Sequence, residues 1–135
     1  MRQVITTGII GLLFAGLAIL FWPKPNDLEA VVKGWDKGEA VSIAEHFTPT
    51  KEVRLFLPNV DGVFTTTQAE AKLAAFFENN PVQGFKLLHI GDAIKAGDSY
   101  LIGLLVTDNN AFRVFMYLNE KNVTHVEARA IGESV

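Results

Sequence analysis

Residues 100–118 read "YLIGLLVTDNNAFRVFMYL", and this stretch decides the fold of the chain. Apolar residues recur at every second position on both sides of the link "DNN" at residues 108–110, which is the period of a β-strand. So short a link cannot hold a crossover connection and demands an antiparallel hairpin. The stretch therefore predicts two paired strands at about 99–107 and 111–119.

The flanking sequence adds further strands to this hairpin. Residues of about 83–90 and 123–131 also read as strands, joined to it through the turn-rich links "GDAIKAGDS" and "NEKN". Further upstream, "EVRLFLP" at residues 52–58 alternates in the same way, and Val63 and Phe64 form a short returning strand after the turn "PNVDG". The second half of the chain is thus expected to be a meandering antiparallel sheet.

Three helices are expected before and between these strands. Apolar residues at helical spacing predict helices at about 27–37 and 39–47, separated at Gly38, where glycine readily adopts a helix C-cap conformation. The first helix is expected to begin with Asn26 as its N-cap and Glu29 completing a capping box.

The third helix lies in "FTTTQAEAKLAAFFENNP" at residues 64–81. Thr67 followed by Glu70 predicts a capping box at its start. Phe76 and Phe77, in its last turn, straddle one apolar stripe, which favours a core plug over one wall of a ligand pocket. Because helices and strands are segregated along the chain, we expect an α+β fold with a bent antiparallel sheet wrapped around N-terminal helices.

Residues 1–25 are expected to be a signal peptide or a membrane anchor helix, ahead of a single domain at 26–135. Arg2 precedes a segment without charge, and residues 4–22 are apolar or small over a length suited to a bilayer. Either interpretation places the domain outside the cytoplasm, in the periplasm or at the cell surface, with membrane contact only through residues 4–22.

Composition excludes several classes of function. The net charge is −3 and the basic residues are scattered singly, which argues against nucleic acid as a partner. The absence of cysteine excludes disulfides and a lipidated-cysteine anchor. His46, Asp61 and His125 lack metal-ligand spacing, so we expect neither a metal site nor a cofactor.

The chain resembles the bacterial domain of unknown function numbered 4783, within the nuclear-transport-factor-2-like (cystatin-like) group of cone-shaped α+β domains. The resemblance rests on "KGEAVSIAEHF", "FTTTQAEAKLAAFFENNP", "GFKLLHIGDA" and "YLIGLLVTDNNAFRVFMYL", in order and spacing. The last strand, "EARAIGE", departs from the family pattern. The resemblance implies an exported, stand-alone cone with no established activity.

Both faces of the predicted sheet carry apolar residues, although only one face can contact the helices. The alternation favours an outer face that carries Leu101, Leu105, Phe115 and Tyr117. This pattern predicts a homodimer formed through the outer face of the sheet. Arg113 would lie on that face, where it either pairs with Glu127 or another acid or recognises a carboxylate across the interface.

Candidate ligand-binding residues are His89, Tyr100 and Phe77. The alternation places His89 on the same face as Phe85 and Leu87, near the mouth of the cone, where a core role and a general-base role both remain open. We expect a non-catalytic binding domain for a small apolar ligand or a partner protein.

The alternative is a small isomerase-like or hydrolase-like enzyme with its site inside the cone. A ketosteroid-isomerase-type site needs an aspartate base and a protonated acid within one apolar cavity. Asp61, Asp92, Asp98 and Asp108 all fall in predicted turns, and no catalytic residues are assigned.

Overall fold

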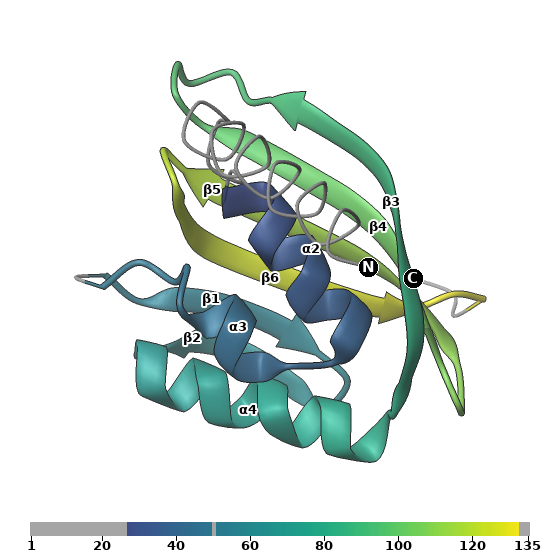
Figure 1. The fold of residues 1–135 in the computed structure, drawn as a ribbon. Helices are drawn as coiled ribbons and strands as arrows, with labels where there is room; N and C mark the ends of the chain where they lie inside the picture. The colour runs from purple at the N-terminus through teal and green to yellow at the C-terminus, as the bar shows by residue number, and fades with distance from the viewer. Residues whose placement is uncertain (1–26, 50, 133–135) are drawn as a thin grey trace, which may run out of the picture.

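The computed structural model describes residues 27–49 and 51–132 (Figure 1). The helices are α2 (Asp27–Lys37), α3 (Ala40–Ala44) and α4 (Thr66–Asn79). The strands are β1 (Val53–Leu57), β2 (Val60–Phe64), β3 (Val82–Asp92), β4 (Ser99–Thr107), β5 (Ala111–Asn119) and β6 (Asn122–Ala130). The predicted order of elements is confirmed.

The strands form one six-stranded sheet in the order β2-β1-β6-β5-β4-β3. Figure 1 shows this sheet curving around α2, with α3 and α4 gathered on the same side. The α+β fold class is therefore confirmed. One strand pair departs from the antiparallel pattern, because β1 runs parallel to β6 with Leu55 opposite Val126. A parallel pair of strands requires a long connection. Between β1 and β6 the chain forms β2, α4, β3, β4 and β5.

The space between α2 and the sheet is filled by Trp35, whose side chain is fully buried. Its ring stacks on Phe85 at a centroid distance of 5.9 Å and meets Phe77 edge-on at 5.5 Å. Its indole Nε1 donates a hydrogen bond to the Sδ atom of Met116 at 2.9 Å. Side chains from helices and sheet thus meet in the hollow of the cone at this residue.

The structure reverses the predicted faces of β4. Leu101 and Leu105, which the alternation placed outside, are fully buried in the core. The strand register explains this result, because it pairs Leu101 with Met116 and Leu105 with Phe112, both of them core residues. Both rows of β4 are apolar, so its own alternation could not distinguish the inner row from the outer row.

The start of α4 also differs from the prediction. Thr65, not Thr67, is the N-cap, and Gln68, not Glu70, completes the capping box. Thr65 Oγ1 accepts a hydrogen bond from the Gln68 backbone N–H at 3.2 Å, and Gln68 Oε1 accepts one from the Thr65 N–H at 3.1 Å. Three consecutive threonines offered several starting points, and glutamine serves this motif as well as glutamate does.

The predicted range of α2 is confirmed, and Gly38 follows it with a positive φ of 67°. The cap predicted at Asn26 lies outside the described residues. Helix α3 is shorter than the predicted 39–47, because Phe47 already pairs with Val123 as an isolated bridge to the last strand.

Within residues 27–49 and 51–132, none of the helices combines the length and the apolar character that crossing a bilayer requires. The segment predicted to insert, residues 4–22, lies outside this part of the chain.

Candidate functional site

His89 lies on the outer face of the sheet and not on the core face predicted for it. A register shift between Leu87 and His89 interrupts the alternation of β3 and places His89 opposite Ile102. The imidazole is exposed, and its Nε2 lies 3.1 Å from the Tyr100 hydroxyl. A bulge of this kind reverses the side-chain direction beyond it, and the sequence carries no clear signal for its position. The structure therefore brings the two candidate ligand-binding residues His89 and Tyr100 together on the outer face of the sheet.

Tyr100 lies across the backbone of β3 at Gly91. A Cβ atom at Gly91 would stand 2.5 Å from the Tyr100 Cζ atom, so only glycine leaves room for the ring in this position. Tyr100 is also nearly parallel to Phe115, with ring centroids 6.1 Å apart and planes inclined by 27°. Phe115 in turn meets the His125 ring edge-on at 5.8 Å. Aromatic and imidazole rings thus run across the outer face from β3 to β6.

A cleft of about 510 Å³ opens beside these rings under the loop between β3 and β4. We call it the aromatic cleft, and its lining residues are Asp92, Ala93, Ile94, Lys95, Tyr100, Phe115 and Tyr117. The volume falls within the usual range for small-molecule pockets. The Ile94 side chain, which borders the cleft from this loop, is fully exposed to solvent.

Asp98 supports the cleft through a hydrogen bond to Tyr117, one of the lining residues. Its side chain is almost fully buried, at 4% exposed. Its carboxylate accepts hydrogen bonds from the Tyr117 hydroxyl at 2.6 Å, the Asn119 Nδ2 at 3.0 Å and the Glu120 backbone N–H at 3.2 Å. Glu120 has a positive φ of 59°, so Asp98 ties the β3–β4 loop to a strained turn between β5 and β6. The sequence placed Asp98 in a turn and gave no sign of these partners.

The hydrogen bond between Tyr117 and Asp98 sets the charge state of both groups. Donation from Tyr117 holds the pKa of Asp98 below its ordinary value, and the same bond raises the pKa of Tyr117. At neutral pH Asp98 is therefore ionised and Tyr117 protonated. An ionised Asp98 can accept hydrogen bonds but cannot donate one, so it cannot act as a protonated oxyanion donor.

We expect the stability of the domain to fall at both extremes of pH because of this pair. The lowered pKa of Asp98 contributes stability above its ordinary value of about 4, and this contribution is lost as the pH falls through the folded pKa. The raised pKa of Tyr117 contributes stability below its ordinary value of about 10, and this contribution is lost as the pH rises through the folded pKa. Thermal melts across this range measure both limbs.

Asp98→Asn is the variant that tests this assignment, and Asp61→Asn is its matched control. Asp98→Asn should flatten the acid limb, whereas Asp61→Asn should leave most of it intact, because Asp61 is exposed and bound only to the exposed Arg54, at 3.1 Å. An acid limb that is identical in wild type and Asp98→Asn would contradict the assignment.

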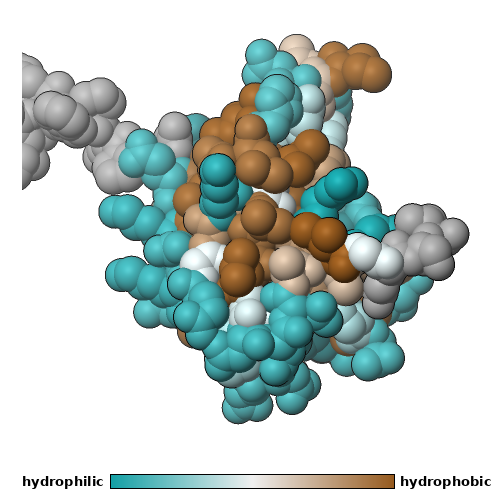
Figure 2. Space-filling model, turned by 90° about the vertical axis from the view of Figure 1, so that its right-hand side faces the viewer, coloured by the Kyte–Doolittle hydropathy of each residue, from teal (hydrophilic) through white to brown (hydrophobic). Residues whose placement is uncertain are grey.

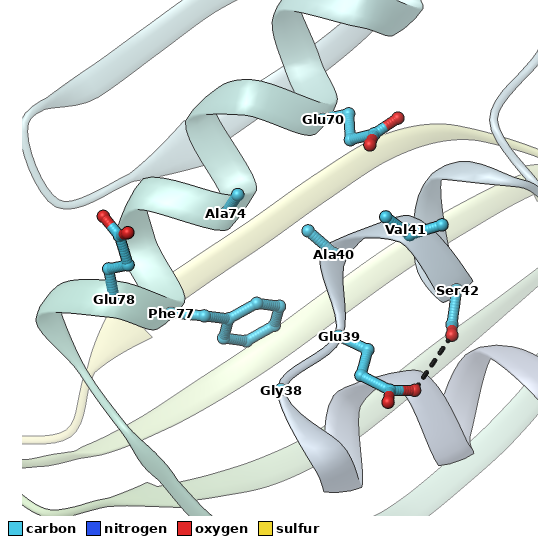
Figure 3. A pocket seen from close by; sticks show the side chains of 9 residues that line it. All are labelled: Gly38, Glu39, Ala40, Val41, Ser42, Glu70, Ala74, Phe77 and Glu78. Carbon is cyan, nitrogen blue, oxygen red and sulfur yellow. Dashed lines mark hydrogen bonds between the residues drawn. The ribbon is translucent and has the colours of Figure 1, made fainter.

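Phe77 does not join His89 and Tyr100. It projects from α4 toward Gly38, at the floor of a separate groove of about 560 Å³ between α3 and α4 (Figure 3). The carboxylates of Glu39, Glu70 and Glu78 surround this groove. Phe77 is only 7% exposed and packs against Trp35, so most of its ring belongs to the core.

The outer face retains three of the predicted interface residues. Phe115 and Tyr117 are half-buried there, and Arg113 is exposed. Glu127 binds His125 at 3.0 Å and Arg129 at 3.2 Å. The predicted pair between Arg113 and Glu127 is therefore not formed. Within the described part of the chain, Arg113 has no ion pair.

Strand pairing also creates a basic row that the sequence does not reveal. Lys86 of β3 lies opposite Leu104 of β4, Leu104 lies opposite Arg113 of β5, and Arg113 lies opposite Arg129 of β6. These basic residues are far apart in the chain, and only the strand register brings them together. Over residues 27–49 and 51–132, His, Asp and Glu side chains form no group of three suited to a metal ion.

Comparison with known proteins identifies the family. The sequence model of the domain of unknown function DUF4783 matches residues 28–127. The chain belongs to this family. A DUF4783 protein from Bacteroides uniformis is 25% identical, with a TM-score of 0.69 over 78% of this chain and 97% of that chain. A DUF4783 protein from Bacteroides fragilis is 28% identical, with a TM-score of 0.65 over 75% of this chain and 95% of that chain.

More distant structures share the fold of this DUF4783 domain. An NTF-2 like protein of unknown function from Burkholderia xenovorans is 12% identical, with a TM-score of 0.54 over 81% of this chain and 83% of that chain. The predicted nuclear-transport-factor-2-like architecture is therefore confirmed. None of the curated proteins compared with the chain matches it.

Proposed function

We propose that this DUF4783 protein is an exported, non-catalytic binding domain that dimerises through the outer face of its sheet. The observation that carries the proposal is the apolar character of that face. Its outward residues on β4 and β5 include Tyr100, Ile102, Leu104, Val106, Phe115 and Tyr117. The described helices all pack on the opposite face, so none of these side chains is covered by them.

The surface view agrees with this interpretation. Figure 2 shows a hydrophobic area framed by hydrophilic groups on the side of the molecule where β3 lies. Val106, in the outward row of β4, is 41% exposed. Exposed apolar areas with a polar border mark interaction sites in soluble proteins, and a sheet face that met only water would carry polar residues.

A second copy of the chain is the partner that we favour. Most soluble oligomers are symmetric homodimers in which one surface meets its own copy. The solved relative from Bacteroides uniformis is matched over 97% of its length, so it contains little besides this domain to cover the face. Export is supported by the apolar segment at residues 4–22, which precedes the domain.

Sedimentation of residues 26–135 tests the proposal. We expect a dimer at micromolar concentration, and we expect Ile102→Lys to weaken it at least about tenfold, because a charge would enter its apolar centre. Val41→Lys is the matched control, since Val41 is 58% exposed on α3, away from the sheet face. A wild-type domain that stays monomeric throughout the micromolar range would overturn the proposal.

A small enzyme is the second candidate, and the contact of His89 with Tyr100 favours it. A general base within hydrogen-bond reach of a phenol, beside a cleft of about 510 Å³, is an arrangement used in proton transfer. The ionised state of Asp98 and the raised pKa of Tyr117 argue against chemistry at the rest of the cleft. Hydrolysis of activated esters that disappears in His89→Ala would favour the enzyme, and unchanged background hydrolysis would favour the binding domain.

A further inference from the structure

The groove between α3 and α4 is a second surface of the domain, separate from the sheet. It measures about 560 Å³ and lies between the start of α3 and one stripe of α4 (Figure 3). Glu70, Ala74 and Glu78 form that stripe, because residues four apart in a helix share a face. The helices pack on the side of the sheet opposite its outer face, so the groove stays open in the proposed dimer.

Small and apolar side chains make the floor of this groove. Ala40 of α3 and Ala74 of α4 line it from opposite sides, and the Phe77 ring lies at its bottom (Figure 3). Val41 lies at its border and is 58% exposed. Because alanine fills little of the space between two helices, the groove offers room and apolar surface for side chains that the described residues do not supply.

The charged residues that line the groove are all acids, namely Glu39, Glu70 and Glu78. Neither Glu70 nor Glu78 forms an ion pair with a residue that the structure describes. The lysine of α4, Lys72, does not line the groove and lies instead over the Phe64 ring of β2, at 4.9 Å from its centroid. Three carboxylates around one hollow create a negative potential that attracts cations. The groove is therefore complementary to a partner that is both basic and apolar.

Two other kinds of occupant fit the groove less well. A metal ion would need acids or histidines that converge, and no group of three does so over residues 27–49 and 51–132. An extended peptide gains affinity from main-chain hydrogen bonds with the edge of a sheet, whereas this groove is lined by helices and the link between them. A helix that inserts apolar side chains needs no backbone partner from the groove.

The acids of α4 set the spacing of the partner's cations. Glu70 and Glu78 lie about two turns apart, or about 12 Å along the helix axis. Basic residues at positions i and i+7 of a second helix are about 10.5 Å apart, which matches this distance. Apolar residues at i+3 and i+4 lie between them on the same face of that helix.

We infer that the groove between α3 and α4 binds a basic amphipathic helix of a partner protein. The apolar side chains of this helix enter the groove over Ala74 and Phe77, and its cations lie beside Glu70 and Glu78. The inference goes beyond the proposed dimer and does not depend on it, because the two surfaces lie on opposite sides of the sheet.

Two synthetic helical peptides test the inference with residues 26–135, a unit that corresponds to nearly the whole of the solved Bacteroides uniformis relative. One peptide has lysines at i and i+7 around leucines at i+3 and i+4, and the other has glutamates in place of the lysines. By fluorescence anisotropy we expect the lysine peptide to bind at least about tenfold more tightly, with a preference that shrinks as salt rises. Equal affinity for both peptides, or no binding of the lysine peptide at about 1 mM, would overturn the inference.

Charge reversal shows whether the peptide occupies this groove. Glu70→Lys and Glu78→Lys should each weaken binding of the lysine peptide about tenfold, because a repulsion replaces an attraction. The double variant should instead prefer the glutamate peptide. Asp92→Lys is the matched control, since it makes the same change in net charge at the aromatic cleft and should change the affinity less than about twofold. A double variant that kept the wild-type preference would overturn the inference.

Val41→Lys and Ile102→Lys separate this inference from the proposed dimer. Val41→Lys should weaken binding of the lysine peptide and leave the dimer intact, because Val41 borders the groove on α3. Ile102→Lys should weaken the dimer and leave peptide binding intact, because Ile102 belongs to β4. A dimer that binds neither peptide would overturn this inference alone, and a monomer that binds the lysine peptide would overturn the proposed dimer alone.

Discussion

Replacing Trp35 with alanine is expected to lower the free energy of unfolding by about 3–5 kcal/mol. The indole is fully buried and contacts both Phe77 and Phe85. Its removal leaves a cavity between α2 and the sheet, and such a cavity adds to the free energy lost with the buried side chain. Because small domains are stable by only about 5–15 kcal/mol, the variant should approach the limit of folding. Urea denaturation followed by circular dichroism measures the loss.

Trp35→Phe is the informative control for this substitution. It keeps an aromatic ring near Phe77 and removes the hydrogen bond from Nε1 to Met116. We expect its cost to be clearly smaller than that of Trp35→Ala, since most of the effect comes from packing and not from the weak sulfur acceptor. Equal costs for the two variants would show that the hydrogen bond dominates, contrary to this account.

Phe76→Ala and Phe77→Ala should each cost about 3 kcal/mol or more. Phe76 is 5% exposed and meets Phe112 of β5 edge-on at 5.1 Å, so it fastens α4 to the sheet. Phe77 is 7% exposed and meets Trp35, so it fastens α4 to α2. The two rings face different partners, and both are needed to hold one helix. Denaturant midpoints of the single variants test the prediction.

Glu78→Ala is the matched control on the same turn of α4. Its side chain is exposed, and its replacement should change stability by less than about 0.5 kcal/mol. If Phe77→Ala resembled Glu78→Ala instead of Phe76→Ala, the ring of Phe77 would be acting as a groove wall and not as a core residue.

The strands of this fold could be predicted because their links are short and their alternation is strong. The expected ranges 99–107 and 111–119 coincide with β4 and β5. Face assignment failed on β4, since apolar residues occupy both of its rows, whereas Phe115 and Tyr117 of β5 lie on the outer face as predicted. Leu101 and Leu105 therefore proved to be core residues.

The candidate site was less predictable, because it depends on relations between strands. A bulge placed His89 on the outer face, and no residue type marks that bulge. Asp98 acquired its role from Tyr117 and Glu120, which belong to a neighbouring strand and the turn after it. Tyr100 and Phe115 were identified from their chemistry alone, but their stacking depends on strand register.

The parallel pairing of β1 with β6 has a consequence for how the chain acquires its structure. Strand β1 lies between β2 and β6, so its second neighbour in the sheet is the last strand of the domain, with Leu55 beside Val126. Contacts between distant parts of a chain form slowly, because the entropy cost of closing a long loop comes before the contacts contribute any stability. While the protein is being synthesised, β1 and β2 must wait for residue 130 before the sheet can be completed. The core of this domain is therefore expected to close only after nearly the whole chain has been synthesised, and not progressively from its N-terminal end.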